Sequence, residues 1–269
     1  MRQQPSYRDL VTAAYYDDPL VDAAERYRNS NEWETIRSLL PNVKHTALDV
    51  GAGRGIASYA LAHEGFQVSA LEPDASELVG ASAIRSLAKM QDLPITVAQE
   101  FSEQLPFPDK KFDLVFARAV LHHLTDMHSA CREFFRVLKP GGKFIAVREH
   151  VISRPEDLEL FLNIHPLHHL YGGENAFLLE DYITPISEAG LEIQQVISPL
   201  ESPINFAPHT LQTLKKEIAK KATKNLPFAR DIVRFGLGIP PVWSITEYLL
   251  GKVDHRPGRH YSFIANRPE

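Results

Sequence analysis

The sequence predicts an α/β protein whose mostly parallel sheet is covered by helices on both faces. Between about residues 46 and 149, short apolar segments of strand length alternate with segments of helical periodicity, which is typical of consecutive βα units. The first apolar segment, Thr46–Val50, runs into a turn with glycine at positions 51, 53 and 55. An acidic residue, Glu72, follows the second apolar segment. Together these features favour a nucleotide-binding unit within a doubly wound sheet.

The composition is that of an ordinary globular protein. Of the 269 residues, 44% are hydrophobic and 23% are charged. The formal net charge of −5 gives no global basic field, so we expect no nucleic-acid partner. A single cysteine, Cys131, excludes an internal disulfide and suits a reducing compartment. The chain shows neither the apolar core of a signal peptide nor a run near the ~20 residues of a spanning helix, so we expect a cytoplasmic protein.

Residues 1–45 are expected to form a helical N-terminal arm. Helical periodicity covers residues 6–40, with breaks at Pro19 and at Asn29–Asn31. The arm is rich in tyrosine, at positions 7, 15, 16 and 27. It could simply pack on the core, or it could also act as a lid that supplies aromatic contacts to a ligand. The two interpretations are compatible.

The remaining elements follow in a regular order. We expect a helix over 56–63, a strand over 68–71, a helix over 74–90, a strand over 95–99, a strand over 112–116, a helix over 130–138 and a strand over 143–148. The last of these helices is ended by the Lys139–Gly142 segment, in which proline and glycine break the helix.

The glycine turn suits a ligand that approaches the backbone closely. Glycine has no Cβ and adopts positive φ readily. The following helix would present free N–H groups at its first turn. A dinucleotide site has its glycines spaced G-x-G-x-x-G, whereas the third glycine here, Gly55, comes one residue early. This spacing counts against a nicotinamide-dependent oxidoreductase.

Four stretches in this order resemble the motifs of class I S-adenosylmethionine-dependent methyltransferases. They are TALDVGAGRG at 46–55, Glu72, LPFPDKKFDLVFARAVLHHL at 105–124 and LKPGGKF at 138–144. The resemblance covers about residues 45–149. It implies a seven-stranded sheet whose last strand is antiparallel, with the sixth and seventh strands at Leu191–Ser198 and His260–Asn266. It also implies a methyltransferase domain over residues 46–269 that uses S-adenosyl-L-methionine as its cofactor.

The resemblance further implies which residues bind the cofactor. Glu72 would accept hydrogen bonds from the ribose hydroxyls. Many relatives carry an acidic or small residue at the position of Phe101, where its side chain can reach the adenine amino group. Phe101 could stack on adenine but cannot accept a hydrogen bond from that group. Glu100 or the backbone of Ser102 could accept it instead. The expected cofactor-binding residues are Asp49, Gly51, Ala52, Gly53, Glu72, Pro73, Phe101, Ser102 and Arg118.

A first insertion, at about 150–175, follows the fifth strand. It leaves the carboxyl end of that strand, where α/β sheets bind ligands, and it is rich in titratable groups. The expected substrate-facing residues are Arg148, Glu149, His150, Tyr171 and Glu174. His165, His168 and His169 with Glu174 could coordinate a metal, but a catalytic histidine is the preferred interpretation and we expect no metal. Individually, most of these residues could instead hold the loop.

Transfer of a methyl group to oxygen or nitrogen also requires removal of a proton, for which histidine is suited near neutral pH. The candidate general bases are His122 and His123 after the fourth strand, and His165, His168 and His169 in the insertion.

A second insertion spans about residues 199–258. Leu211, Leu214 and Ile218 recur at helical spacing. The same segment has a basic face of lysines, at positions 215, 216, 220, 221 and 224. It could be a cap helix with a solvated lysine face, or it could lie on a membrane surface or bind an acidic partner. We expect both insertions to form a cap over the substrate.

The sequence therefore predicts a methyltransferase that acts on a small molecule, by O- or N-methylation rather than C-methylation. The alternatives are a non-catalytic scaffold that binds the cofactor, and a methyltransferase that acts on a lipid-linked or glycan substrate at a membrane surface. The motifs specify neither the methyl acceptor nor the oligomeric state.

Overall fold

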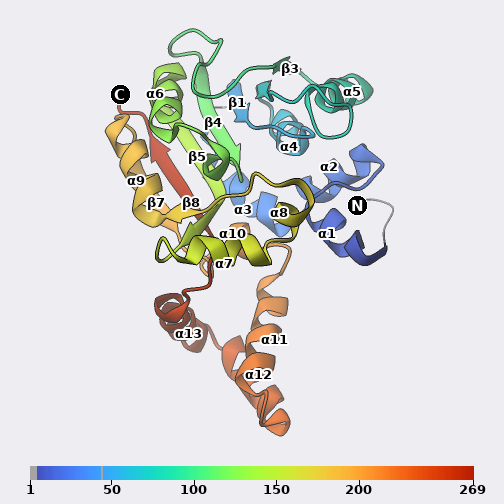
Figure 1. The fold of residues 1–269 in the computed structure, drawn as a ribbon, viewed down its shortest axis with the longest axis vertical. Coiled ribbons are helices and arrows are strands. Elements are labelled where there is room, and N and C mark those ends of the chain that lie inside the picture. Colours follow the sequence, from blue (N-terminus) through green and yellow to red (C-terminus); the bar gives the residue numbers. More distant parts are fainter. Residues whose placement is uncertain (1–4, 44) are drawn as a thin grey trace.

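A computed structural model describes residues 5–43 and 45–269, and its strands form one sheet (Figure 1). The strand order is β3-β2-β1-β4-β5-β8-β7, and β8 is antiparallel to both of its neighbours. The strands are β1 (Thr46–Val50), β2 (Gln67–Leu71), β3 (Ile95–Ala98), β4 (Phe112–Arg118), β5 (Leu138–Ile152), β6 (Phe177–Leu178), β7 (Glu192–Ile197) and β8 (Arg259–Asn266). The seven strands on this path confirm the expected sheet. The two-residue β6, which pairs with the end of β5, makes an eighth.

Helices cover both faces of the sheet. The central ones are α4 (Ile56–His63), α5 (Ala81–Gln91), η2 (Leu121–His123), α6 (Met127–Val137) and α9 (Leu179–Glu188). Apolar side chains of α6 and α9, including Phe134 and Tyr182, form one core layer with the sheet. Side chains of α4 and of the N-terminal arm, including Trp33, form the other. The doubly covered α/β architecture is therefore as expected.

One helix begins later than its pattern indicated. The segment expected to be helical over 74–90 forms α5 only from Ala81. Asp74 holds the preceding residues in a turn, because its side chain accepts a hydrogen bond from the Ser76 backbone N–H and its carbonyl accepts one from Ala81. A short acidic side chain that bonds to nearby backbone competes with helix formation.

The N-terminal arm consists of η1 (Pro5–Tyr7), α1 (Arg8–Ala13), α2 (Leu20–Arg28) and α3 (Asn31–Leu39). Its breaks fall where the sequence placed them. Ser30 begins α3 by accepting a hydrogen bond from the Trp33 N–H at 3.1 Å, which satisfies one of the free donors of the first turn. The Trp33 ring then packs edge-on against Phe116 of β4. This contact fixes the second half of the arm on the sheet.

The two insertions differ in position. The first forms α7 (Asp157–Ile164) and α8 (Pro166–Tyr171) beside the carboxyl ends of the strands. The second forms α10 (Pro203–Phe206), α11 (Leu211–Ala222), η3 (Pro227–Ala229), α12 (Arg230–Gly238) and α13 (Pro240–Val253). Figure 1 shows α11, α12 and α13 extending away from the sheet as a separate helical projection. Within the described residues, no helix is both long enough and apolar enough to cross a bilayer.

Candidate functional site

The glycine turn has the backbone that its residues predict. Gly51, Gly53 and Gly55 have φ values of 59°, 55° and 80°, a region that side chains other than glycine rarely adopt. A Cβ on Gly51 would lie 2.8 Å from a methyl group of Val120, so the space behind the turn is full. A Cβ on Gly53 would meet no atom of the chain within 4 Å. The turn is therefore packed at Gly51 and open at Gly53, where a ligand has room to approach the backbone.

Two carboxylates flank this turn. Glu72, directly after β2, accepts a hydrogen bond from the Gly53 N–H at 2.7 Å and another from the Asp74 N–H at 3.0 Å. Each carboxylate oxygen has a second lone pair, so both can still accept a hydroxyl. Asp49 is buried and accepts a hydrogen bond from Ser58 at 2.5 Å. Burial raises the pKa of Asp49 to about 7, although the bonds from Ser58 oppose the shift.

The arm covers the turn. Arg54, a buried residue of the turn, donates hydrogen bonds to the carbonyl oxygens of Tyr15 and Asp17 and pairs with Asp18. A cavity of about 110 Å³ lies between the arm and the turn. Its lining is made by Ala14, Tyr15 and Tyr16 on one side, by Asp49, Gly51, Ala52, Gly53, Arg54, Ile56 and Ala57 on the other, and by Arg118.

A larger cavity of about 400 Å³ adjoins the first, and Ala14 and Arg118 line both. Its wall includes five histidines, at positions 122, 123, 150, 165 and 260, together with Glu174. The Glu174 carboxylate lies 3.7 Å from His122 Nε2, 3.9 Å from His150 Nε2, 3.9 Å from His165 Nδ1 and 4.0 Å from His123 Nε2. We call the five histidines and Glu174 the histidine cluster. Its residues come from four parts of the chain, which are η2, β5, the first insertion and β8.

Hydrogen bonds behind the rings orient the cluster. His122 Nδ1 lies 2.6 Å from the Glu149 carboxylate, and His150 Nδ1 lies 3.0 Å from the Gly258 carbonyl oxygen. Burial lowers the pKa of His122, but the contacts with Glu149 and Glu174 outweigh it and raise that pKa to about 9. Burial and the neighbouring His122 lower the pKa of His150 to about 3. Burial would raise the pKa of Glu174, but the surrounding histidines lower it to about 2.

The structure brings together some of the predicted catalytic residues and separates others. His122, His123 and His165 line the larger cavity. His168 lines a different depression beside α7, and His169 Nε2 lies 2.7 Å from the Asn163 carbonyl oxygen. His168 and His169 thus lie apart from the larger cavity, and their role as general bases stays a prediction. His165 precedes Pro166 and is extended, so it does not share a helical face with them.

The predicted substrate-facing residues also divide. His150 and Glu174 line the larger cavity, whereas the side chain of Tyr171 lies outside the described part of the chain. Arg148 lines the cavity too, but it donates to the carbonyl oxygens of Ile204 and Ala207 and so ties α10 to the sheet. Glu149, which was expected to face the substrate, does not line the cavity. Its side chain has no exposed area and bonds to the His122 ring and to the backbone N–H groups of Val120 and His122.

Most of the predicted cofactor residues surround the smaller cavity. Asp49, Gly51, Ala52, Gly53 and Arg118 line it, and Glu72 bonds to its edge. Arg118 also forms a two-point ion pair with Glu32, which occupies much of its guanidinium. The contacts of Pro73, Phe101 and Ser102 with the adenine end of a cofactor stay predictions, since these residues do not line this cavity.

Sequence reasoning missed His260. It lies directly opposite His150 in the antiparallel pairing of β8 with β5, and the two rings are 4.8 Å apart. The expected antiparallel seventh strand begins at this residue, so its register against the fifth strand is the signal that could have found it.

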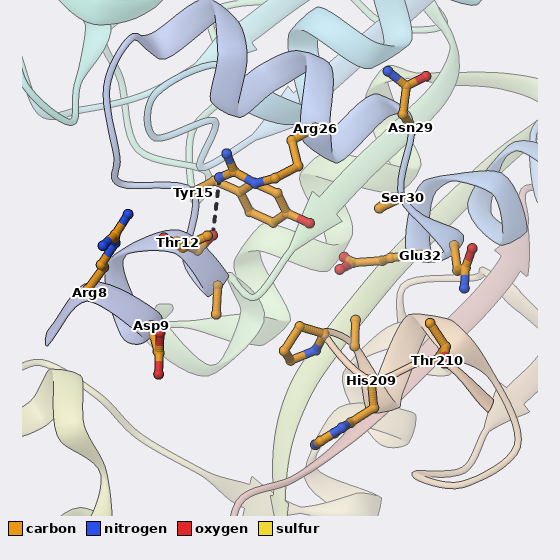
Figure 2. Close-up of a pocket in the computed structure, with 14 residues that line it drawn as sticks. Arg8, Asp9, Thr12, Tyr15, Arg26, Asn29, Ser30, Glu32, His209 and Thr210 are labelled. Atoms are coloured by element: carbon orange, nitrogen blue, oxygen red, sulfur yellow. Dashed lines mark hydrogen bonds between the residues drawn. The ribbon is translucent and has the colours of Figure 1, made fainter. Parts of the chain in front are cut away.

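A third cavity of about 690 Å³ lies between the arm and the segment before α11. In Figure 2, Tyr15 and Glu32 extend toward its middle, and His209 lies on the side away from Arg26. Arg26 donates a hydrogen bond to the Thr12 carbonyl oxygen at 3.2 Å. The segment Ala13–Tyr15 contributes to all three cavities, so they meet beneath this part of the arm.

Comparison with known proteins finds similarity around the glycine turn. Residues 48–146 match the family model described as "Methyltransferase domain". An uncharacterized methyltransferase, YcgJ of Bacillus subtilis, is 29% identical over 164 residues, which cover 55% of this chain and 60% of YcgJ. The ubiquinone/menaquinone biosynthesis C-methyltransferase UbiE of Rickettsia bellii is 36% identical over 121 residues, which cover 42% of this chain and 48% of UbiE. The chain thus matches only about half of the length of these relatives.

Structural similarity to known proteins extends over more of the chain than sequence similarity does. The geranyl diphosphate C-methyltransferase of Streptomyces coelicolor aligns over 94% of this chain and 87% of its own, with a TM-score of 0.62 and 15% identity. At that identity the likeness concerns the fold alone. The family match, by contrast, covers the glycine turn and the strands around it. Residues 48–146 are therefore similar to methyltransferase domains.

Proposed function

We propose that this chain, whose residues 48–146 match a methyltransferase domain, transfers the methyl group of S-adenosylmethionine to a small acceptor bound against the histidine cluster. One observation carries the proposal. The cavity at the glycine turn and the cavity of the histidine cluster adjoin, and both are lined by Ala14 and Arg118. A donor and an acceptor bound in these two spaces would therefore be neighbours.

The residues at the turn fit the cofactor. Glu72 has free lone pairs for ribose hydroxyls, and the space at Gly53 admits a ligand to the backbone N–H groups. Asp49, beside the same cavity, would favour the positive charge of the cofactor when ionised. S-adenosylmethionine supplies a methyl group that is already activated on a sulfonium, so the protein mainly has to align the acceptor and exclude water.

The histidine cluster suits an oxygen or nitrogen acceptor. Such an acceptor gives up a proton as the new bond to the methyl carbon forms, and a ring nitrogen of the cluster would accept it. The arm would act as a lid, since Arg54 links it to the turn and Ala13–Tyr15 lies over all three cavities. UbiE and the geranyl diphosphate enzyme described above are both named as C-methyltransferases, so the atom that is methylated is a direct test of this part of the proposal.

Calorimetric titration with S-adenosylhomocysteine tests the donor site. We expect Glu72→Ala to weaken binding at least about 30-fold, because two charge-assisted hydrogen bonds are lost. Glu77→Ala, which removes an exposed carboxylate five residues later, is the matched control and should bind as the original protein does. Equal affinities for all three proteins would refute the assignment of the donor site.

Methyl transfer itself can be tested with methyl-labelled S-adenosylmethionine and a fractionated extract of small metabolites. We expect label to appear on an oxygen or nitrogen of a product, and Glu174→Gln to reduce it. A protein that binds S-adenosylhomocysteine but labels nothing in the extract would favour the alternative of a non-catalytic scaffold. Label on carbon would refute O- or N-methylation.

A second candidate, methylation of a lipid-linked acceptor at a membrane surface, is favoured by the helical projection of residues 211–253. The exposed side chains of α12 and α13 include Ile232, Phe235, Ile245 and Leu249, with exposed fractions of 73%, 76%, 62% and 57%. The projection carries eight Lys or Arg residues against three Asp or Glu, in a chain whose formal net charge is −5. Apolar side chains beside basic ones suit an anionic lipid surface.

Sedimentation with vesicles tests this second candidate. We expect binding to vesicles that contain phosphatidylserine, weak binding to vesicles of phosphatidylcholine alone, and loss of binding in the double variant Phe228→Ser, Phe235→Ser. A dimer in light scattering that the same double variant dissociates, without vesicle binding, would overturn the membrane interpretation and assign the apolar surface to a second copy of the chain.

A further inference from the structure

The histidine cluster has an unusual distribution of donors and acceptors. The Gly258 carbonyl oxygen can only accept a hydrogen bond, so His150 Nδ1 must donate to it. The two Glu149 oxygens accept the backbone N–H groups of Val120 and His122, and His122 Nδ1, 2.6 Å from the same carboxylate, donates to it in the same way. A metal ion binds the neutral ring, and in that form Nε2 of both His122 and His150 carries a lone pair. Both lone pairs face the Glu174 carboxylate, which is itself an acceptor.

Neither of these rings is hydrogen-bonded to Glu174 through Nε2. The Nε2 atoms of His122 and His150 lie 3.7 and 3.9 Å from Glu174, beyond the usual range of a hydrogen bond. One ligand atom from each of His122, His150 and Glu174 can be chosen so that all three lie within 4.8 Å of one another. A tetrahedral zinc ion with bonds of 2.0–2.2 Å would set its ligand atoms roughly 3.4 Å apart. The three groups are thus slightly wider than a filled site and need only a small contraction.

The surroundings of the ligands resemble those of a metal centre. A histidine that binds a metal commonly donates its other ring N–H to a carboxylate or a backbone carbonyl, which fixes the tautomer and the ring orientation. His122 does so to Glu149, and His150 does so to Gly258. A fourth group is at hand, because His165 Nδ1 is buried without a hydrogen-bond partner and lies 3.9 Å from Glu174.

We propose that His122, His150 and Glu174 bind a divalent transition-metal ion of the zinc type, with His165 as an additional ligand. Two imidazoles and one carboxylate favour zinc and its neighbours over magnesium or calcium, which prefer oxygen ligands. The set differs from the one suggested by the sequence of the insertion, since His168 and His169 lie elsewhere. His122 comes from η2 and His150 from near the end of β5, and only the fold brings these residues together with Glu174 of the insertion.

The site lies in the wall of the cavity assigned to the acceptor. An ion there would bind an oxygen or nitrogen of the acceptor and lower the pKa of that group. The proton released as the methyl bond forms would pass to Nε2 of His123, which is not a ligand and whose Nδ1 donates to the Gly173 carbonyl oxygen. This role rests on the proposed function, whereas metal binding itself does not. The acceptor class it implies is a small molecule with a metal-binding hydroxyl, phenol or amine.

The test uses the 269-residue chain after treatment with a chelator and gel filtration. Zn²⁺ is added, excess ion is removed, and bound zinc is measured by mass spectrometry; Co²⁺ serves as a spectroscopic probe through its visible ligand-field bands. We expect about one bound ion per chain. Glu174→Gln and His150→Ala should each weaken binding at least about 100-fold and abolish the Co²⁺ bands. Glu149→Gln, which removes no ligand but weakens the hydrogen bonds that orient His122, should weaken binding about 10- to 100-fold.

The double variant His168→Ala, His169→Ala is the matched control, because it removes two nearby histidines that lie outside the cluster, and it should bind zinc as the original protein does. Titration with S-adenosylhomocysteine shows that each variant is folded. A protein that binds S-adenosylhomocysteine but retains no zinc would overturn the metal site and leave the proposed function standing. Zinc binding that Glu174→Gln leaves unchanged would also overturn it. Zinc binding without S-adenosylhomocysteine binding would instead refute the donor site.

Discussion

The glycine turn and the histidine cluster lie in adjoining cavities but are built in opposite ways. The turn uses backbone N–H groups and two carboxylates from one continuous segment, residues 49–74. The cluster uses side chains from four segments that only the sheet and the insertion bring together. A site made of backbone depends on its local conformation, whereas a site made of side chains depends on the groups that hold each ring. Substitutions should therefore act on the two in different ways.

The largest effect is expected for the group that supports the cluster. Glu149→Ala removes a buried, ionised carboxylate and leaves the Val120 and His122 N–H groups without an acceptor. Loss of one partner of a buried pair costs about 3–5 kcal/mol of unfolding free energy. Urea denaturation measures it. A change below about 1 kcal/mol would contradict the dependence of the cluster on this support.

The next effect separates two positions of the turn. Gly51→Ala combines a positive φ with a contact against Val120 and should cost about 3 kcal/mol of stability. Gly53→Ala has a positive φ but open space, so it should cost only about 1 kcal/mol. Its Cβ would instead occupy the cavity and weaken S-adenosylhomocysteine binding about 10-fold or more. If both variants lose the same stability and the same affinity, the distinction between a packed and an open glycine fails.

The contrast also explains which parts of the site the sequence could predict. The turn, Asp49 and Glu72 were found because they are contiguous and lie at the ends of β1 and β2, where local pattern specifies geometry. His165 and Glu174 were named, but His168 and His169 were grouped with them from sequence spacing alone. Pro166 extends the residue before it, so the spacing does not describe one helical face. His260 depended on the register between β5 and β8, which no local pattern contains.

The fold shows the same division. The alternation of strands and helices predicted the first five strands of the main path, and the family resemblance implied the last two. The strand expected over 143–148 continues to Ile152 as β5, which was not predicted. This extension places His150 beside the insertion. The second insertion was expected to cap the substrate, but no residue of 211–253 lines the three cavities described above. Only the parts of the insertion near its two ends, at Ala207–Thr210 and Pro257–Gly258, reach them.

A smaller effect concerns pH and the carboxylate behind the turn. Burial raises the pKa of Asp49 from 3.8 to about 7. The folded state then holds this proton more tightly than the unfolded state does. Its contribution to stability is fully present below the unfolded pKa and is lost as the pH rises through about 7. We expect the free energy of unfolding to fall by about 2 kcal/mol more between pH 5 and pH 7 in the original protein than in Asp49→Asn.

Urea denaturation at several pH values measures this difference. Ser58→Ala is the useful companion variant, because its hydroxyl donates to Asp49 and opposes the shift. Without that hydrogen bond the pKa of Asp49 should rise further, and the loss of stability should extend to higher pH. If the free energy of unfolding depends on pH in the same way in the original protein and in Asp49→Asn, burial does not raise the pKa of Asp49.

The smallest effect is expected on the helical projection, which supplies the contrast to both sites. Phe235 is 76% exposed, so Phe235→Ser removes little packing and should change the free energy of unfolding by less than about 0.5 kcal/mol. Trp243→Ala is different, because Trp243 packs with Ala219 and Leu237 in the small core of the projection. It should unfold the projection while zinc and S-adenosylhomocysteine still bind, since 211–253 line neither cavity. Titration of both ligands, with circular dichroism for helix content, measures this. If Trp243→Ala abolished either affinity, the projection would belong to the site rather than stand apart from it.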